Sequence, residues 1–325
     1  MTYRVGADLG GTYSKAAVVD QEGRVVARFS EPTPRARAPE ACVEGLLTAI
    51  RRAADWVEAR MGRSPEGYGV SVNSPFEHGD VIHLNNNLPA LEGFALRSYL
   101  RRRLEAPVVL EWDINAALLG ELWAGAASGR RRVVMVSIGT GVAAAISVRG
   151  QLLRWVYDQT PGEMGHMVVA RDGPVCTCGG RGCWEEMVSS RAVLRIAREI
   201  AAGGEFPALR ALLDGGEGLT PEAISRLADT GDPGARAVWQ EVGEWLGVGV
   251  ASLAQIFLPD RVVVGGGISL AGEKLLAPCR ASVDRHVGDA LRGSFDIVPA
   301  ALGQDSALVG AASLVSESPG GQASR

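Results

Sequence analysis

Hydrophobic and polar positions follow two different periods along the chain. Short apolar runs bounded by glycine or polar turns predict β-strands, and stretches with apolar residues every three or four positions predict helices. The predicted strands are Tyr3–Gly10, Ser14–Asp20, Arg24–Ser30, Gly67–Ser74, Pro107–Asp113, a strand–turn–strand series over 131–156, and a strand that enters a glycine turn within Arg261–Ser269. The predicted helices are Val43–Met61, Ile114–Ala127, Ala235–Leu258 and Ser306–Val315. This alternation indicates an α/β protein.

One pattern occurs twice. Val5–Gln21 aligns without a gap with Val134–Gly150, and both segments read as apolar strand, Gly/Thr turn, apolar strand and polar turn. Few residues are identical, so the repeat is one of pattern. Two such hairpins, each beginning one half of the chain, predict two related α/β domains that flank a cleft.

Composition and charge narrow the class of protein. The chain has 325 residues, of which 46% are hydrophobic and 22% charged, enough for two domains with full cores. A net charge of -4 and a pI near 5.7 do not favour nucleic acid or anionic membrane as partners, and the arginine runs at 101–103 and 130–132 are expected to be solvated faces. Neither a secretion signal nor a membrane-spanning stretch is seen, so we expect a cytoplasmic protein.

Three glycine turns are candidates for nucleotide binding. Asp8–Thr12 (DLGGT) and Gly139–Gly141 (GTG) place small residues and a hydroxyl at hairpin tips, where backbone N–H groups can approach a phosphate. Asp8 would bring a carboxylate for Mg²⁺. Gly265–Gly267 (GGG) follows an apolar strand and could face the sugar or base of a nucleotide. Each could be an ordinary turn, and neither GxxxxGK[ST] nor a complete dinucleotide fingerprint is present.

A cluster of metal-ligand residues lies in the middle of the chain. His166, Cys176, Cys178 and Cys183 form a Cys₃His set typical of structural zinc, with glycines at 179, 180 and 182 that let the loop wind tightly. The alternatives are a reduced, metal-free loop or a catalytic zinc, which would keep an open coordination position. The other two cysteines, Cys42 and Cys279, are expected to be core thiols on helices.

Together these motifs resemble the ROK sugar kinases (repressor, open reading frame, kinase), in the actin-like, hexokinase-like ATPase fold. DLGGT and GTG resemble the two phosphate motifs, WDINAALLGE the catalytic-aspartate motif, and VVVGGGIS the adenosine-side turn. GEMGH followed by CTCGGRGCWE resembles the zinc and sugar-binding signature, the most specific of these. The resemblance implies phosphorylation of a hexose or amino sugar with MgATP.

The resemblance also implies roles for individual residues. The expected ATP site is Asp8, Gly10, Gly11, Thr12, Lys15, Gly139, Thr140, Gly141, Gly265, Gly266 and Gly267. The expected sugar site is Asn87, Trp112, Asp113, Glu163, His166 and Glu185. His166 would bind both zinc and sugar, so that zinc orders the sugar site. Asp113 would be the general base, although its position before a helix also suits a helix N-cap.

This sequence departs from the family pattern around the sugar and near one phosphate turn. Trp112 stands where the family has Asn before the catalytic aspartate, and an indole offers one N–H donor and no acceptor. Ala90 and Leu91 replace Gly and Trp in the Asn87 loop, and VNSPFEHG lacks the usual Pro-Gly pair. After GTG, residues 143–145 are alanines where the family has further glycines. The sugar-side changes leave the choice of substrate open.

We therefore expect an ATP-dependent sugar kinase that uses the 6-hydroxyl of a hexose, amino sugar or related polyol, with Mg²⁺ and a structural zinc. The small domain is expected at 1–115 with about 302–318, the large domain at 116–301, and a disordered tail at 319–325. The family implies a homodimer. The alternatives are a catalytically weak sugar sensor of the same fold and an unrelated zinc ATPase. A repressor would need an N-terminal helix-turn-helix, for which this sequence leaves no room before the first strand.

Overall fold

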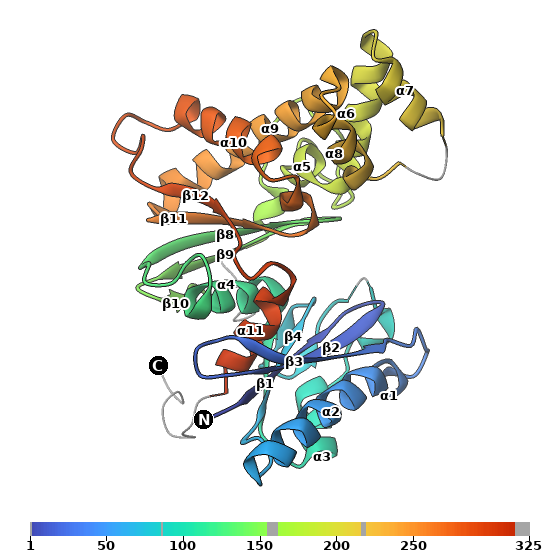
Figure 1. Cartoon of the computed structure of the whole chain (residues 1–325), viewed down its shortest axis with the longest axis vertical. Coiled ribbons are helices and arrows are strands. Elements are labelled where there is room, and N and C mark those ends of the chain that lie inside the picture. Colours follow the sequence, from blue (N-terminus) through green and yellow to red (C-terminus); the bar gives the residue numbers. More distant parts are fainter. Residues whose placement is uncertain (1, 86, 155–161, 216–218, 316–325) are drawn as a thin grey trace. The chain divides into compact units, whose positions relative to one another are not determined.

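The computed structural model describes residues 2–85, 87–154, 162–215 and 219–315. The chain divides into two compact units (Figure 1). The first comprises Met1–Gly129, Gln151–Gly162 and Ala301–Arg325, and the second comprises Arg130–Gly150 and Glu163–Ala300. Helix α4 (Asp113–Ala124) lies whole in the first unit.

The first unit is built on a five-stranded sheet in the order β3-β2-β1-β4-β7. Its strands are β1 (Arg4–Leu9), β2 (Tyr13–Val19), β3 (Val25–Pro32), β4 (Tyr68–Val72) and β7 (Val108–Trp112). The first three strands are antiparallel neighbours, and β4 and β7 continue the sheet parallel to β1. The carboxyl ends of β1, β4 and β7 therefore meet at one edge.

Helices cover both faces of this sheet, which explains the continuous apolar run of β2. Ala16 and Val18 belong to the core on the side of α2 (Glu44–Met61), whereas Ala17 and Val19 pack with residues of α11 (Ser306–Ser313). Successive strand residues point to opposite faces, so a strand covered on both sides is apolar throughout. The remaining elements of this unit are α1 (Pro39–Cys42), β5 (Phe76–Glu77), β6 (Val81–Ile82), η1 (Pro89–Leu91), α3 (Leu96–Leu104), α4 (Asp113–Ala124) and η4 (Gly303–Asp305).

The second unit repeats the topology of the first. Its strands have the order β9-β8-β11-β12, again an antiparallel hairpin continued by parallel strands. They are β8 (Arg132–Ile138), β9 (Val142–Val148), β11 (Arg261–Gly265) and β12 (Asp296–Pro299). The short strand β10 (Gln151–Leu152) belongs to the first unit. The repeat predicted from the sequence pattern is thus confirmed at the level of topology.

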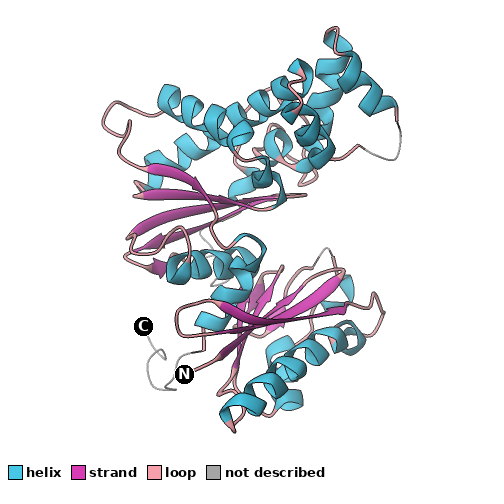
Figure 2. Ribbon diagram, in the orientation of Figure 1, coloured by secondary structure: helices cyan, strands magenta, loops and turns pink. Residues whose placement is uncertain are grey.

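The second unit carries most of the helices (Figure 2). They are α5 (Glu185–Val188), α6 (Ser190–Gly203), α7 (Pro207–Asp214), α8 (Pro221–Asp229), α9 (Pro233–Phe257) and α10 (Glu273–His286), with short turns at η2 (Met164–His166) and η3 (Gly267–Ala271). The longest helix, α9, ends just before Pro259, as the sequence predicted. The residues that it buries are apolar. No helix in the described ranges is both long and apolar enough to cross a membrane.

Within the described residues, the strands and helices named from the sequence are found, with ends shifted by a few residues. Residues 155–156 of the predicted strand–turn–strand series lie outside the described residues. Cys42 and Cys279 are fully buried thiols on α1 and α10, as expected. Both arginine runs lie largely at the surface, and Arg132 pairs with Asp260. The expected disordered tail at 319–325 lies outside the described residues.

Helix α11 packs unusually close to α4, which gives a prediction about stability. A Cβ on Gly310 would lie 1.6 Å from the carbonyl oxygen of Ala116, a backbone atom with little freedom to move. We expect Gly310→Ala to lower the free energy of unfolding by about 1–3 kcal/mol or more, because the two helices must separate. Urea denaturation measures this.

Gly203, at the end of α6, is the matched control, because among the described residues no atom lies within 4 Å of its added Cβ. Gly203→Ala should leave stability unchanged or raise it by up to about 1 kcal/mol. Equal effects of the two substitutions would show that the close approach at Gly310 is unimportant.

Candidate active site

Three polar side chains gather where β1, β4 and β7 end. Asp8 lies opposite Ser71 in the β1–β4 register, and Val72 lies opposite Trp112 in the β4–β7 register. Asn73 and Asp113 are the residues that follow these two strands. The parallel pairing therefore places Asp8, Asn73 and Asp113 on neighbouring strand ends, the edge where α/β folds bind ligands.

Asp113 is held by two hydrogen bonds. The Asn73 Nδ2 group donates to its Oδ2 at 2.6 Å, and the Ile114 backbone N–H donates to its Oδ1 at 2.7 Å. Burial raises the pKa of Asp113 to about 6, and the charge of Asp8 adds to this effect, whereas the bond from Asn73 opposes it. A carboxylate with such a pKa is suited to accept a proton near neutral pH.

The N-cap interpretation of Asp113 is wrong. The N-cap of α4 is Trp112, and Asp113 is the first residue of the helix. Its carboxylate bonds the N–H of the adjacent residue, not that of the second or third helical residue as a cap would. The second carboxylate oxygen of Asp113 accepts from Asn73, the residue that follows the neighbouring strand β4.

Asp8 lies between a hydroxyl and a cation. The Ser71 hydroxyl donates to Asp8 Oδ1 at 2.8 Å, and Lys15 is opposite Asp8 in the β1–β2 register. Burial raises the pKa of Asp8, whereas Ser71 and the charge of Lys15 lower it. A bound cation would favour the ionised form of this carboxylate, so Asp8 fits a role beside Mg²⁺ and phosphate.

The DLGGT turn has no room for a side chain at Gly10 and little at Gly11. A Cβ on Gly10 would lie 2.4 Å from the Tyr13 carbonyl oxygen, and a Cβ on Gly11 would lie 3.0 Å from Cβ of Asn87. The predicted sugar-side residue Asn87 thus lies against the predicted phosphate turn. Asn85 fixes this loop, since its Oδ1 accepts from the backbone N–H groups of Asn87 and Leu88 at 3.1 and 2.8 Å.

The second glycine turn, GTG, joins β8 to β9 in the other unit. Its Gly139 N–H donates to the Gly141 carbonyl at 2.9 Å. The N–H groups of Thr140 and Gly141 have no partner among the described residues, and such groups at a turn can bind an anion. Next to it, Gly266 has a φ of +84°, and a Cβ there would lie 2.3 Å from the Ile138 carbonyl oxygen. The GGG turn therefore needs glycine where it approaches the end of β8.

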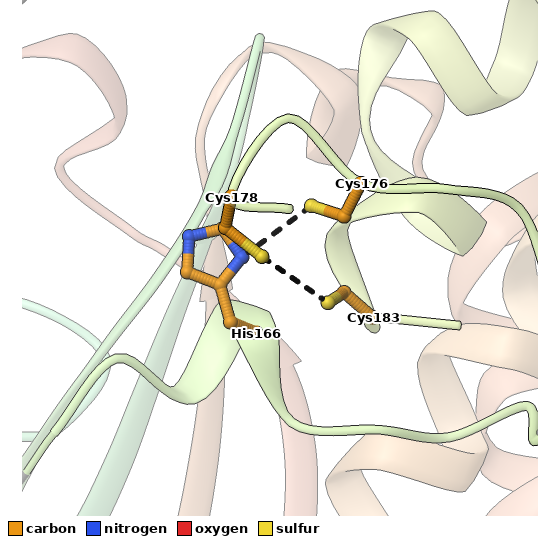
Figure 3. Close-up of side chains that lie close together, drawn as sticks. All are labelled: His166, Cys176, Cys178 and Cys183. Atoms are coloured by element: carbon orange, nitrogen blue, oxygen red, sulfur yellow. Dashed lines mark hydrogen bonds between the residues drawn. The ribbon is translucent and has the colours of Figure 1, made fainter. Parts of the chain in front are cut away.

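The cysteines and the histidine converge, as Figure 3 shows. Ligand atoms of His166, Cys176, Cys178 and Cys183 all lie within 4.8 Å of one another. Cys176 Sγ lies 3.6 Å from His166 Nδ1, and Cys178 Sγ lies 3.7 Å from Cys183 Sγ. With zinc bonds of about 2.3 Å to sulfur and 2.0 Å to nitrogen, a tetrahedron has S–S edges of about 3.8 Å and N–S edges of about 3.5 Å. The four side chains fit a zinc ion.

Glycines and a buried tryptophan shape the loop of this cluster. Gly179 and Gly182 have φ angles of +89° and +70°, and a Cβ on Gly182 would lie 1.6 Å from the Ala170 carbonyl oxygen. Trp184 directly follows the last cysteine and is fully buried, with its Nε1 donating to the Trp245 carbonyl at 3.0 Å. The loop is therefore anchored to α9.

A model of the ROK family matches residues 4–318. The chain belongs to the ROK family. A glucokinase from Streptomyces coelicolor is 35% identical over 322 residues, and the alignment covers 98% of each chain. A xylose repressor from Bacillus subtilis is 29% identical, with 96% of this chain and 77% of the repressor covered.

The fold of this ROK protein is the actin-like, hexokinase-like ATPase fold, as the sequence resemblance implied. The solved structure of a ROK family glucokinase from Streptomyces griseus, in complex with glucose and AMPPNP, has a TM-score of 0.79 and 34% identity. That match covers 97% of this chain and 99% of the glucokinase. A ROK hexokinase from Thermus thermophilus has a TM-score of 0.75 and 30% identity, with 96% and 97% covered.

The predicted sugar residues of the second unit differ in their surroundings. Glu163 is exposed and precedes the η2 turn, to which His166 belongs. Glu185 is buried, and its Oε2 accepts from the Val142 N–H beside the GTG turn at 2.9 Å. Its contact with the sugar stays a prediction.

Sequence reasoning missed several polar residues that hold the predicted site residues within each unit of this ROK protein. Asn73 bonds the predicted base, and Arg191 bonds Glu185. Glu111, only 2% exposed, pairs with Arg154 and accepts from Asn115 Nδ2 at 3.0 Å, directly before Trp112. The only available signal was position: Asn73 follows an apolar strand, just as Asp113 does.

Proposed function

We propose that this ROK protein transfers the γ-phosphate of MgATP to a hydroxyl, with the 6-hydroxyl as first candidate, of a hexose, amino sugar or related polyol. It is a carbohydrate kinase by its relationship to ROK glucokinases over nearly its whole length. The observation that carries the finer proposal is the carboxylate of Asp113, held at a strand end by Asn73 with its pKa raised to about 6.

In this proposal Asp113 accepts the proton of the attacking hydroxyl. Phosphoryl transfer depends mainly on positioning and charge neutralisation, and a base placed at the hydroxyl contributes typically about 10²–10⁴-fold. Mg²⁺, when bound, supplies the charge neutralisation on the phosphates. Asp8 and Lys15 would act beside it, and the DLGGT and GTG turns would hold phosphate oxygens through backbone N–H groups.

Zinc is proposed as a structural ion that orders the sugar site. His166, Cys176, Cys178 and Cys183 would hold it, and no open position remains for catalysis by a bound water. Glu163 lies three residues before the first ligand and Glu185 two residues after the last. Folding of the loop around the ion would therefore fix His166 and these two glutamates, which are proposed hexose contacts. Asn87 is a further proposed hexose contact, on a loop that Asn85 holds.

The test is ADP release with MgATP across glucose, mannose, allose, N-acetylated and free amino sugars, and cyclitols. Release that depends on one or two of these compounds is expected, and Trp112 should influence which ones. ADP release without any sugar would instead indicate an ATPase.

A second candidate is a sugar-sensing protein of the same fold with weak catalysis. Two observations favour it: the xylose repressors among the relatives, and Trp112 in place of the asparagine of the family pattern. Sugar binding detected by calorimetry, without ADP release from any compound in the panel, would support this candidate.

The pKa of Asp113 predicts the pH dependence of the kinase. Because the base must be ionised, kcat/KM should fall about tenfold per pH unit below about pH 6, where Asp113 becomes protonated. Asn73→Ala should move this acid limb to higher pH, since the bond from Asn73 lowers the pKa. Rate measurements between pH 4.5 and 8.5 test this, and a limb that Asn73→Ala leaves in place would contradict it.

A further inference from the structure

Arg191 joins three parts of the second unit. It lies in the first turn of α6, and its Nη2 group donates to Glu185 Oε1 at 3.0 Å and to Glu186 Oε1 at 2.9 Å. Its Nη1 group donates to the Thr140 carbonyl of the GTG turn at 3.3 Å. One guanidinium therefore contacts both glutamates and the predicted phosphate turn.

Glu185 is bound on both of its carboxylate oxygens. Oε1 accepts from Arg191, and Oε2 accepts from the Val142 N–H at 2.9 Å. A Cβ on Gly141 would lie 2.8 Å from Oε2, so this turn residue must be small for the carboxylate to reach the backbone. The chain that follows Glu185 contacts the GTG turn a second time, since the Ser190 N–H donates to the Gly139 carbonyl at 2.8 Å.

The metal cluster adjoins the same residues. Ligand atoms of Cys176, Glu185 and Glu186 lie within 4.8 Å of one another, and both glutamates are about nine-tenths buried. Two carboxylates and a sulfur ligand thus surround a region where Arg191 supplies the positive charge. Without that charge the carboxylates would repel one another, and Glu185 would lose one of its two donors.

We propose that Arg191 is a positioning residue that couples hexose binding to nucleotide binding. The proposal rests on the kinase function above, in which Glu185 accepts a hydroxyl of the hexose. The same carboxylate holds the N–H at the base of the GTG turn, and Arg191 holds both the carboxylate and the Thr140 carbonyl. A hexose that fixes Glu185 therefore also fixes the turn that binds phosphate, and a bound phosphate fixes Glu185 in return.

The experiment measures the dissociation constant of MgAMPPNP by calorimetry, with and without the hexose that gives the largest ADP signal in the panel, starting with glucose. In the wild type the hexose should tighten MgAMPPNP binding by at least about fivefold. In Arg191→Gln we expect this ratio to fall to near one, and MgAMPPNP alone to bind about tenfold more weakly, because a charged hydrogen bond is lost. In Arg191→Lys part of the affinity should return, since the charge is kept but the fork of donors is not.

Arg195→Gln is the matched control. Arg195 lies one turn later on α6 and donates to the Glu186 carbonyl at 3.0 Å and to Glu199, and within the described residues it has no hydrogen bond to Glu185 or Thr140. It should keep the wild-type coupling ratio. Zinc content and Tm of each variant separate positioning from unfolding: a merely structural role would lower Tm and leave the coupling ratio of the folded fraction unchanged.

The outcomes distinguish this proposal from the kinase function. A wild-type coupling ratio of one, or a wild-type ratio retained in Arg191→Gln, overturns the role of Arg191 while ADP release still supports the kinase. If no sugar gives ADP release, the kinase function fails. The role of Arg191 is then tested by the dissociation constant of MgAMPPNP measured without sugar. If Arg191→Gln binds MgAMPPNP about tenfold more weakly than the wild type, the result supports the role of Arg191 in holding the GTG turn. Equal affinities of the variant and the wild type overturn that role.

Discussion

Asp113→Asn is expected to lower kcat by about 10²–10⁴-fold while leaving sugar binding intact. The amide keeps the shape of the carboxylate, and its Nδ2 can donate to Asn73 once the Asn73 amide turns its oxygen toward it, but it cannot accept the proton of the attacking hydroxyl. Sugar-dependent ADP release measures kcat, and calorimetry with the active sugar measures binding. Substantial remaining turnover would remove Asp113 from the role of base.

The same substitution should make the protein more stable at pH 7, which separates a catalytic role from a structural one. The pKa of Asp113 is raised in the fold to about 6, so the ionised carboxylate costs stability above that pH, and the cost disappears below the unfolded-state pKa of about 4. A shift of about two units corresponds to at most about 3 kcal/mol at pH 7. Asp113→Asn should therefore raise Tm at pH 7 and change it little at pH 4.

Removal of zinc is expected to have the second large effect. The purified protein should contain about one zinc per chain, as four converging ligands imply. Stripping the ion should lower Tm and raise the KM for the sugar by about 10–100-fold, because Glu163, His166 and Glu185 lie at the two ends of the loop that the ion closes. Metal analysis, thermal unfolding and kinetics before and after addition of Zn²⁺ test this.

Two cysteine variants provide the control. Cys183→Ser replaces one of the buried ligands and should lose zinc together with activity. Cys42→Ser lies outside the cluster, and its hydroxyl can replace the thiol that donates to the Ala36 carbonyl at 3.3 Å, so its zinc content should stay normal. A protein that is folded and fully active without metal would overturn the structural role of zinc.

The sequence predicted those parts of this protein that depend on neighbouring residues. Hydrophobic periodicity located the strands and helices, because the period of burial is set within each element. The four metal ligands lie within 18 residues, so that their spacing and the glycines between them already indicated a closed cluster. The role of Asp113 as base was predicted from the resemblance of WDINAALLGE to the catalytic-aspartate motif of the ROK family, which is also a local signal.

Tertiary structure decided which polar groups share an environment. Asn73 and Asp113 are 40 residues apart and meet only because β4 pairs in parallel with β7. Glu185 and Val142 are 43 residues apart, and Arg191 reaches Thr140 only because α6 begins beside the GTG turn. The raised pKa of Asp113 likewise arises from burial and from Asp8 on another strand. Such contacts depend on strand pairing and helix packing between distant segments, which no local pattern of residues records.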